Sequence, residues 1–252
     1  MRKAKASASV ASHQGRWRVC AAAIALLLLA GPAYGQGEQP TNKQIWIDYN
    51  PTWPLNKRLI FDLQISQRIA LTDPRFWQLN TRSTLTFKPR KWVDLTCGLW
   101  LIYTDQTTSL DTFETRPYVG LRLNWTTWRG IKLNNYFRVE LRIQFELGAD
   151  NTQISNQFRD RIQALIPINK RDLSENGVWY AIADVEWFWN SNQELQERFQ
   201  SRRRYRLGVG WKKSDAWSFQ FIYTLQQARD TIGAPFSTTD HIFRFRSIQT
   251  FK

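Results

Sequence analysis

Apolar and polar residues alternate along this chain with a period of two. In residues 131–147 the odd positions are apolar apart from Asn135, and the even positions are charged or polar, among them Arg138 and Glu140. Successive side chains of a β-strand point to opposite faces, so this segment predicts a strand with one apolar and one charged face. A helix would spread the same charges around its circumference.

Ten segments share this pattern. They are residues 59–70, 76–88, 92–104, 113–126, 131–147, 154–168, 178–190, 199–211, 216–226 and 240–251. Most have 11 to 17 residues, whereas strands of soluble proteins typically have about five or six and a tilted strand crosses a hydrocarbon layer with roughly 9 to 11. The predicted fold is therefore all-β: a transmembrane up-and-down antiparallel β-barrel of about ten strands, with twelve as the alternative.

Three parts are predicted along the chain. Residues 1–35 form a cleaved signal peptide, residues 36–57 an N-terminal periplasmic or plug segment, and residues 58–252 the outer-membrane β-barrel. Part of the middle segment, Lys43 to Pro54, also looks extended. Counting it as a crossing gives eleven strands, against the even number expected of bacterial barrels.

Turns of two lengths alternate between the predicted strands. Residues 88–91, 127–130 and 212–215 are short connections, whereas 105–112, 148–153, 191–198 and 227–239 are longer. Outer-membrane barrels place short turns in the periplasm and long loops outside, so this order supports the barrel and an even strand count.

Aromatic residues, including 13 Trp, gather at the strand ends. One end carries Phe87, Trp92, Trp125, Trp128, Trp211 and Trp217, and the other carries Trp77, Tyr103, Phe113, Trp189, Phe199 and Tyr223. Such girdles are typical of lipid-facing barrels. The alternative, a soluble sandwich with these rings in its core, explains single residues but not their sorting to both ends.

The first 35 residues read as an export signal. Arg16 and Arg18 precede the apolar run 19–30, and Ala33 to Gly35 supply the small residues of a cleavage site before Gln36. The run is shorter than the roughly 20 residues of a spanning helix, which disfavours the alternative of an uncleaved anchor. We expect the mature chain in the outer membrane of a Gram-negative bacterium, with Cys97 as its one remaining thiol.

The polar faces of the strands are rich in arginine. The residues predicted to line the lumen are Arg82, Arg116, Arg122, Arg138, Glu140, Arg142, Glu146, Arg159, Arg161, Asp184, Glu186, Arg202, Arg204, Arg206, Arg244 and Arg246. A ten-strand barrel is narrow, and buried charges must be paired. We expect a structural barrel with a salt-bridged lumen; the alternative is a narrow anion-preferring channel.

Enzymatic activity is not expected, and neither are cofactors or metals. The mature chain has one histidine, His241, with Ser237 and Asp240 nearby in sequence, so a lipid acyl hydrolase or transferase is the third hypothesis. The expected partners are outer-membrane lipid and, during biogenesis, the barrel-assembly machinery. Nucleic acid is not expected, although the formal net charge is +14, because the export signal argues against it.

The chain resembles the DUF2490 family. The resemblance rests on Trp46, on the long Arg-bearing alternating strands, and on Phe158-Arg159-Asp160-Arg161 leading into Ile166 to Lys170. It covers most of residues 41–252 and implies an outer-membrane barrel with no established activity. It supplies no catalytic residues.

Overall fold

The computed structural model describes residues 41–72, 75–107, 109–125, 130–191, 201–229 and 234–252. The chain divides into two units, Met1–Gln36 and Gly37–Lys252, and the described residues all belong to the second. These residues contain no helix that is long and apolar enough to cross a membrane. The predicted signal peptide lies outside the described residues and stays a prediction.

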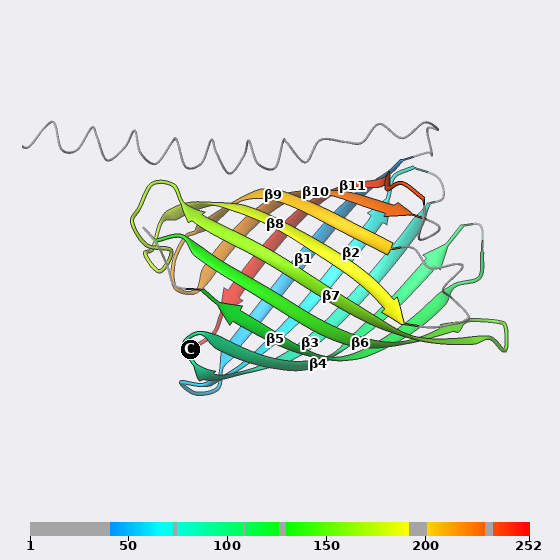
Figure 1. The fold of residues 1–252 in the computed structure, drawn as a ribbon, viewed down its shortest axis with the longest axis horizontal. Helices are drawn as coiled ribbons and strands as arrows, with labels where there is room; N and C mark the ends of the chain where they lie inside the picture. The colour runs from blue at the N-terminus through cyan, green and yellow to red at the C-terminus, as the bar shows by residue number, and fades with distance from the viewer. Residues whose placement is uncertain (1–40, 73–74, 108, 126–129, 192–200, 230–233) are drawn as a thin grey trace, which may run out of the picture. The chain divides into compact units, whose positions relative to one another are not determined.

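Eleven β-strands form one closed barrel (Figure 1). They are β1 (Asn42–Pro54), β2 (Leu59–Ala70), β3 (Phe76–Arg90), β4 (Val93–Gln106), β5 (Thr112–Asn124), β6 (Lys132–Glu146), β7 (Thr152–Pro167), β8 (Val178–Ser191), β9 (Ser201–Lys212), β10 (Trp217–Arg229) and β11 (Ser237–Thr250). Each strand from β2 to β11 pairs antiparallel with its sequence neighbours. The predicted all-β antiparallel barrel is confirmed.

The strand count differs from the prediction because β1 belongs to the barrel. It pairs antiparallel with β2 and parallel with β11, from Asn42↔Asp240 to Thr52↔Thr250. Alternating strands can close a ring of odd number only if one adjacent pair is parallel, and β1–β11 is that pair. The prediction that residues 36–57 precede the barrel or plug it is therefore wrong for Asn42–Pro54, and the count is eleven rather than ten or twelve.

A tight connection after β1 makes this pairing possible. The side chain of Asn56 accepts hydrogen bonds from the backbone N–H groups of Arg58 and Leu59, at 2.8 and 2.9 Å. Asn side chains stabilise turns in this way, so the chain reverses at once and β2 returns along β1. Because the strand number is odd, β1 begins at one end of the barrel and β11 finishes at the other. We call the first the N-terminal end and the second the C-terminal end.

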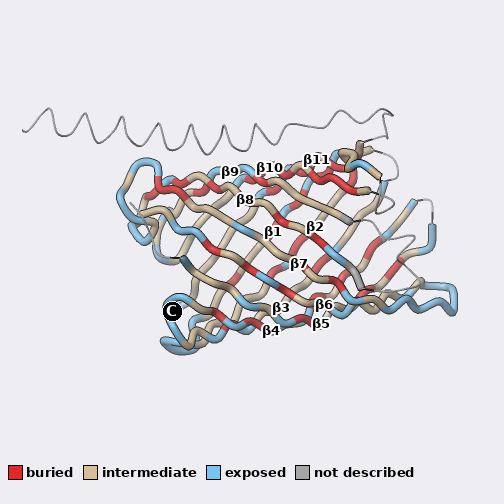
Figure 2. The backbone as a smooth tube through the Cα atoms, in the orientation of Figure 1, coloured by how far each residue is buried: buried red, intermediate tan, exposed pale blue. Residues whose placement is uncertain are grey.

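The polarity of this barrel is the reverse of a soluble protein's. Among the described residues, thirty large apolar side chains are exposed and twenty-five polar or charged residues are buried, against fourteen buried apolar ones. Buried and more exposed residues alternate along the strands (Figure 2). The outer face is thus the apolar face predicted by the period of two, and the charged face lines the lumen.

Inward-facing glycines let tyrosine rings lie flat against the barrel wall. A Cβ on Gly98 would stand 2.5 Å from the Tyr118 hydroxyl, and one on Gly210 would stand 2.1 Å from the ring of Tyr180. Each glycine is paired directly across strands with its tyrosine. Any larger residue would displace the ring, so these glycines determine how much of the lumen the tyrosines fill.

The difference in turn length between the two ends is smaller than predicted. At the C-terminal end the connections 55–58, 91–92 and 213–216 are tight, but 125–131 and 168–177 are longer than the 147–151 connection at the other end. The predicted turn at 127–130 and the loops at 191–198 and 227–239 lie partly outside the described residues.

The 168–177 turn folds over the lumen mouth. Its Leu173 packs on a buried apolar cluster that contains Val178 and Ile222. Within the turn, the backbone N–H of Ser174 donates a 2.7 Å hydrogen bond to Asp172, which holds the pKa of that carboxyl below its ordinary value.

Aromatic rings contact one another near both ends of the strands. Near the C-terminal end, Trp179 stacks on Trp211 at 5.6 Å and Trp211 on Phe219 at 6.0 Å. Near the N-terminal end, Trp77 meets Tyr103 edge-on at 6.2 Å. Two of the predicted girdle residues, Trp128 and Phe199, lie outside the described residues.

Candidate functional site in the barrel lumen

One ion-pair cluster, the Glu140 cluster, joins β5, β6 and β7 inside the barrel. Glu140, which is fully buried, lies 2.7 Å from Arg138, 3.0 Å from Arg159 and 3.7 Å from Arg116. Arg116 also contacts Glu114 at 2.5 Å. Arg142 also binds Glu114, at 2.7 Å, so four arginines face two carboxylates in this cluster.

A second cluster, the Glu186 cluster, joins β8 and β9. The guanidinium of Arg206 reaches both Asp184, at 2.7 Å, and Glu186. Arg204 lies 3.9 Å from Glu186 and donates a 2.6 Å hydrogen bond to Gln226. These groups are almost fully enclosed, so the ion pairs here compensate charges that burial would otherwise penalise.

The third cluster holds the parallel seam. Asp48 of β1, only 1% exposed, accepts hydrogen bonds from Arg244 and from Arg246 of β11. The Ser66 hydroxyl of β2 donates to the same carboxylate at 2.6 Å. This one side chain therefore ties β1 to both neighbouring strands.

Three aromatic rings alternate with three arginines across the lumen, and we name this the aromatic–arginine ring. Arg68 lies 3.9 Å from the Trp46 ring and 5.3 Å from the Trp100 ring. Arg159 lies 5.3 Å from Trp100 and 4.7 Å from Phe188. The cycle closes through Arg204, at 4.8 Å from Phe188 and 5.5 Å from Trp46.

This arrangement fills part of the lumen and stabilises its charges. Cation–π contacts of this kind contribute most where water is excluded. Trp46 and Trp100 are 5% exposed and Phe188 is 2% exposed, so water scarcely reaches the three rings. The Trp46 indole N–H also donates to Gln44 at 2.8 Å, which fixes the orientation of that ring.

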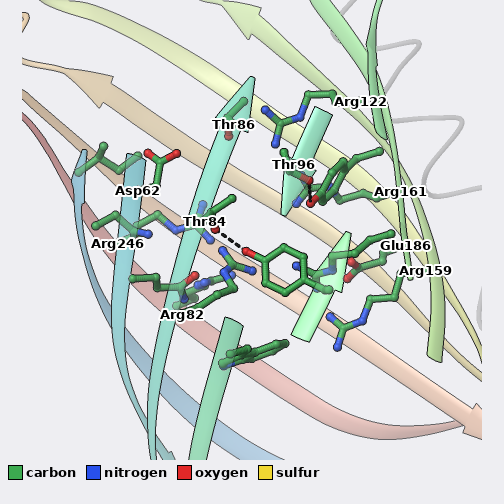
Figure 3. Close-up of a pocket in the computed structure, with 18 of the residues that line it drawn as sticks. Asp62, Arg82, Thr84, Thr86, Thr96, Arg122, Arg159, Arg161, Glu186 and Arg246 are labelled. Atoms are coloured by element: carbon green, nitrogen blue, oxygen red, sulfur yellow. Dashed lines mark hydrogen bonds between the residues drawn. The ribbon is translucent and has the colours of Figure 1, made fainter. Parts of the chain in front are cut away.

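A cavity of about 340 Å³ lies between the aromatic–arginine ring and the C-terminal end. Ten arginines and two carboxylates, Asp62 and Glu186, are among its lining residues. Figure 3 shows side chains from several strands converging on it. The excess of guanidinium groups makes it strongly cationic.

Most of the predicted lumen residues meet in these features. Those that line the cavity are Arg82, Arg122, Arg138, Arg159, Arg161, Glu186, Arg204, Arg206, Arg244 and Arg246. Arg116, Glu140, Arg142 and Asp184 belong to the ion-pair clusters. Arg202, at the start of β9, and Glu146, the last residue of β6, lie toward the N-terminal end of the barrel and form none of the ion pairs given above.

Sequence reasoning missed the residues that organise the lumen. The pattern did not indicate Asp48 because its segment was assigned outside the barrel, and it did not indicate Trp100 because the apolar face of that strand occupies the odd positions. The available signal was that Trp100 occupies the same alternate positions as the polar residues Asp94 and Thr96, so an aromatic ring interrupts the polar face of the strand. Phe188 likewise follows Glu186 on the charged face of β8.

The candidate catalytic residues near the C-terminus do not assemble. His241 Nδ1 lies 2.6 Å from the Tyr223 hydroxyl, a residue of the outer face, whereas Asp240 points inward and accepts a 2.5 Å hydrogen bond from Gln44. Ser237 donates to the Ala228 carbonyl at 3.4 Å. In the described part of the chain, no His, Cys, Asp and Glu side chains form a group suited to holding a metal ion.

The fold and the lumen define a class of protein: a closed β-barrel with an apolar exterior and an arginine-rich, aromatic-filled interior. The chain belongs to the DUF2490 family of proteins of unknown function, whose sequence profile matches residues 43–235. The predicted family is thus confirmed, and its description assigns no activity. Comparisons with curated proteins and with solved structures give no match.

Replacing Asp48 by Asn is expected to lower the free energy of unfolding by about 3–5 kcal/mol, the usual cost of removing one partner from a buried ion pair. The substitution keeps the side-chain volume and leaves Arg244 and Arg246 without their carboxylate. Denaturant unfolding of the mature protein in detergent micelles measures the change.

Asp215→Asn is the matched control, because it breaks the exposed 2.9 Å pair with Lys212. Exposed pairs contribute little to stability, so this variant should unfold like the wild type. If both variants unfolded alike, the seam would not depend on Asp48.

Proposed function

We propose that this protein is an outer-membrane β-barrel with a closed lumen, and that its role is structural and non-enzymatic. The observation that carries the proposal is the reversed polarity of the barrel, with its large apolar side chains outside and its charges inside. Contiguous apolar surface on this scale is unusual for a monomeric soluble protein. A lipid environment stabilises it instead.

The strands have the length that this environment requires. They run from 12 to 16 residues, whereas a tilted strand needs roughly 9 to 11 to cross the hydrocarbon. The closed sheet leaves no unpaired edge, which is a condition for backbone inside a membrane. Aromatic contacts near both ends supply the interfacial anchors typical of such barrels.

Export is supported by the sequence alone. Residues 1–35 have the charged, apolar and small-residue regions of a cleaved signal peptide. Phe243, Phe245 and Phe251 near the C-terminus partly resemble the aromatic signal for barrel assembly, and Phe251 stacks on Trp53 at 5.2 Å. We therefore propose outer-membrane lipid and the assembly machinery as partners.

The aromatic–arginine ring favours a closed barrel over a channel. A water-filled pathway needs a continuous gap, and the three buried rings leave little room for one. The second candidate, a narrow anion-preferring channel, draws support from the arginine excess in the cavity. For that function the ring would have to move aside.

The odd strand number places the two ends of the barrel's chain on opposite sides of the membrane, and the turns indicate which side each end occupies. Three tight turns lie at the C-terminal end, which suits the periplasmic side. Thr41 would then emerge at the cell surface and Lys252 in the periplasm.

Cysteines placed at the two termini of the barrel test location and direction together. In a Cys97→Ala background, a membrane-impermeant maleimide should label Thr41→Cys in intact cells, and Lys252→Cys only after the outer membrane is permeabilised. Labelling of Lys252→Cys in intact cells, with Thr41→Cys labelled only after permeabilisation, would overturn the proposed direction but not the spanning barrel. Labelling of both sites in intact cells, or of neither, would contradict a spanning barrel.

Planar-bilayer recordings distinguish the closed barrel from the channel. The wild-type protein should show no unitary currents, whereas Trp46→Ala with Trp100→Ala removes two of the three rings and should give discrete openings with a preference for anions. The control is Trp189→Ala, which alters a 46% exposed ring on the outer face and should stay silent. Unitary currents from the wild type would favour the channel.

A further inference from the structure

The cavity below the aromatic–arginine ring contains more positive charge than the barrel's own carboxylates neutralise. Seven of its ten arginines have a carboxylate oxygen within 4.0 Å, through the three clusters and through Asp94, which contacts Arg122 at 3.4 Å. Among the described residues, Arg68, Arg82 and Arg161 have none. Arg68 belongs to the aromatic–arginine ring, where it stacks on Trp46.

Arg82 and Arg161 line the cavity and have no carboxylate oxygen within 4.0 Å in the described ranges of the barrel. They come from β3 and β7 and line the same space from different sides (Figure 3). The Nε atom of each is buried and has no hydrogen-bond acceptor. Both residues are partly buried, and a guanidinium without an ion-pair partner in such a place is costly. Their aromatic neighbours lie near the limit of a cation–π contact, with Arg82 5.7 Å from the Trp100 ring and Arg161 5.6 Å from the Tyr136 ring.

Glu186 of β8, the cross-strand neighbour of Arg161, compensates these charges only in part. Of the two lining carboxylates, Glu186 is already shared by Arg204 and Arg206. Asp62 accepts a 2.7 Å hydrogen bond from Thr52 and, within the part of the chain that the structure describes, has no arginine at ion-pair distance. Hydroxyl groups complete the wall, with Thr96 Oγ1 and Tyr136 Oη 2.9 Å apart.

We propose that this cavity binds a small phosphoryl-bearing dianion between Arg82 and Arg161. Two charges on the ligand match the two unpaired guanidinium groups, and a guanidinium fork suits the oxygens of a phosphoryl group. A volume of about 340 Å³ accommodates inorganic phosphate, pyrophosphate or a small phosphate monoester.

A free solute is the source of the phosphoryl group. The cavity is enclosed by the barrel wall, so a lipid headgroup would have to draw its acyl chains past Asp62 and the other polar residues of the lining. Thr52 and Thr86 line the cavity near the C-terminal end of their strands, so the proposed solute would enter from that end of the barrel.

Calorimetric titration of the mature protein in detergent micelles, at constant ionic strength, tests the site. Inorganic phosphate and pyrophosphate should each bind saturably. Arg82→Gln and Arg161→Gln should each weaken binding about tenfold or more, and the double variant should abolish it. Phosphate should also raise the thermal unfolding midpoint of the wild type but not of the double variant, because only the folded wild type binds it.

The matched control is Arg202→Gln. Arg202 also has no carboxylate within 4.0 Å among the described residues, but it lies near the N-terminal end of β9 and does not line the cavity. This variant should bind phosphate as the wild type does. An equal loss of binding in it would show a general charge effect and overturn the site.

Two further outcomes would also overturn the proposal. One is the absence of saturable binding by either inorganic anion. The other is binding of a short-chain phosphatidic acid without binding of inorganic phosphate, which would assign the charge to a lipid. Retained barrel migration on unheated gels shows that each variant is folded.

Discussion

The reversal of side-chain direction at every residue of a strand is the constraint on which this barrel depends. Once the sheet closes, each strand must present one complete face to the exterior and the other to the lumen. Ile47 and Asp48 are neighbours in sequence, yet one is 49% exposed on the outer face and the other 1% exposed inside. A shift of one residue in register would exchange these environments, so the polarity pattern specifies the pairing of every strand.

Closure brings many guanidinium groups into a narrow interior, and the lumen is organised by how each group is compensated. Carboxylates bind some of them, as in the Glu140, Glu186 and Asp48 clusters. Aromatic faces stabilise others, with five arginines lying within 5.8 Å of the Trp100 ring. The clusters hold the strands together and the rings occupy the interior, while two arginines without a carboxylate partner in the described structure, Arg82 and Arg161, line one cavity. The stability of the barrel and its proposed closure and anion binding thus have a common origin in arginine chemistry.

Local pattern was enough to predict the strands, but not which strands meet. The predicted segment 59–70 coincides with β2, and 240–251 differs from β11 by at most three residues. The β1–β11 seam joins residues such as Asp48 and Arg246, which are 198 positions apart, and nothing local in the sequence indicates that pairing. The alternate positions that Arg82 and Arg161 occupy along their strands correctly predicted that their side chains face the lumen. That they lack carboxylate partners depends on the barrel's shear and on neighbours across it, which only the folded chain specifies.

Contact of the apolar exterior with lipid is the proposal on which the other assignments depend. Refolding of residues 36–252 from denaturant, in parallel with and without lipid vesicles, measures this most directly, with circular dichroism and heat-modified gel migration as readouts. The barrel described here should form in vesicles and aggregate in buffer alone. A monodisperse, folded monomer in plain buffer would contradict it, because the exposed outer face could not then require a membrane.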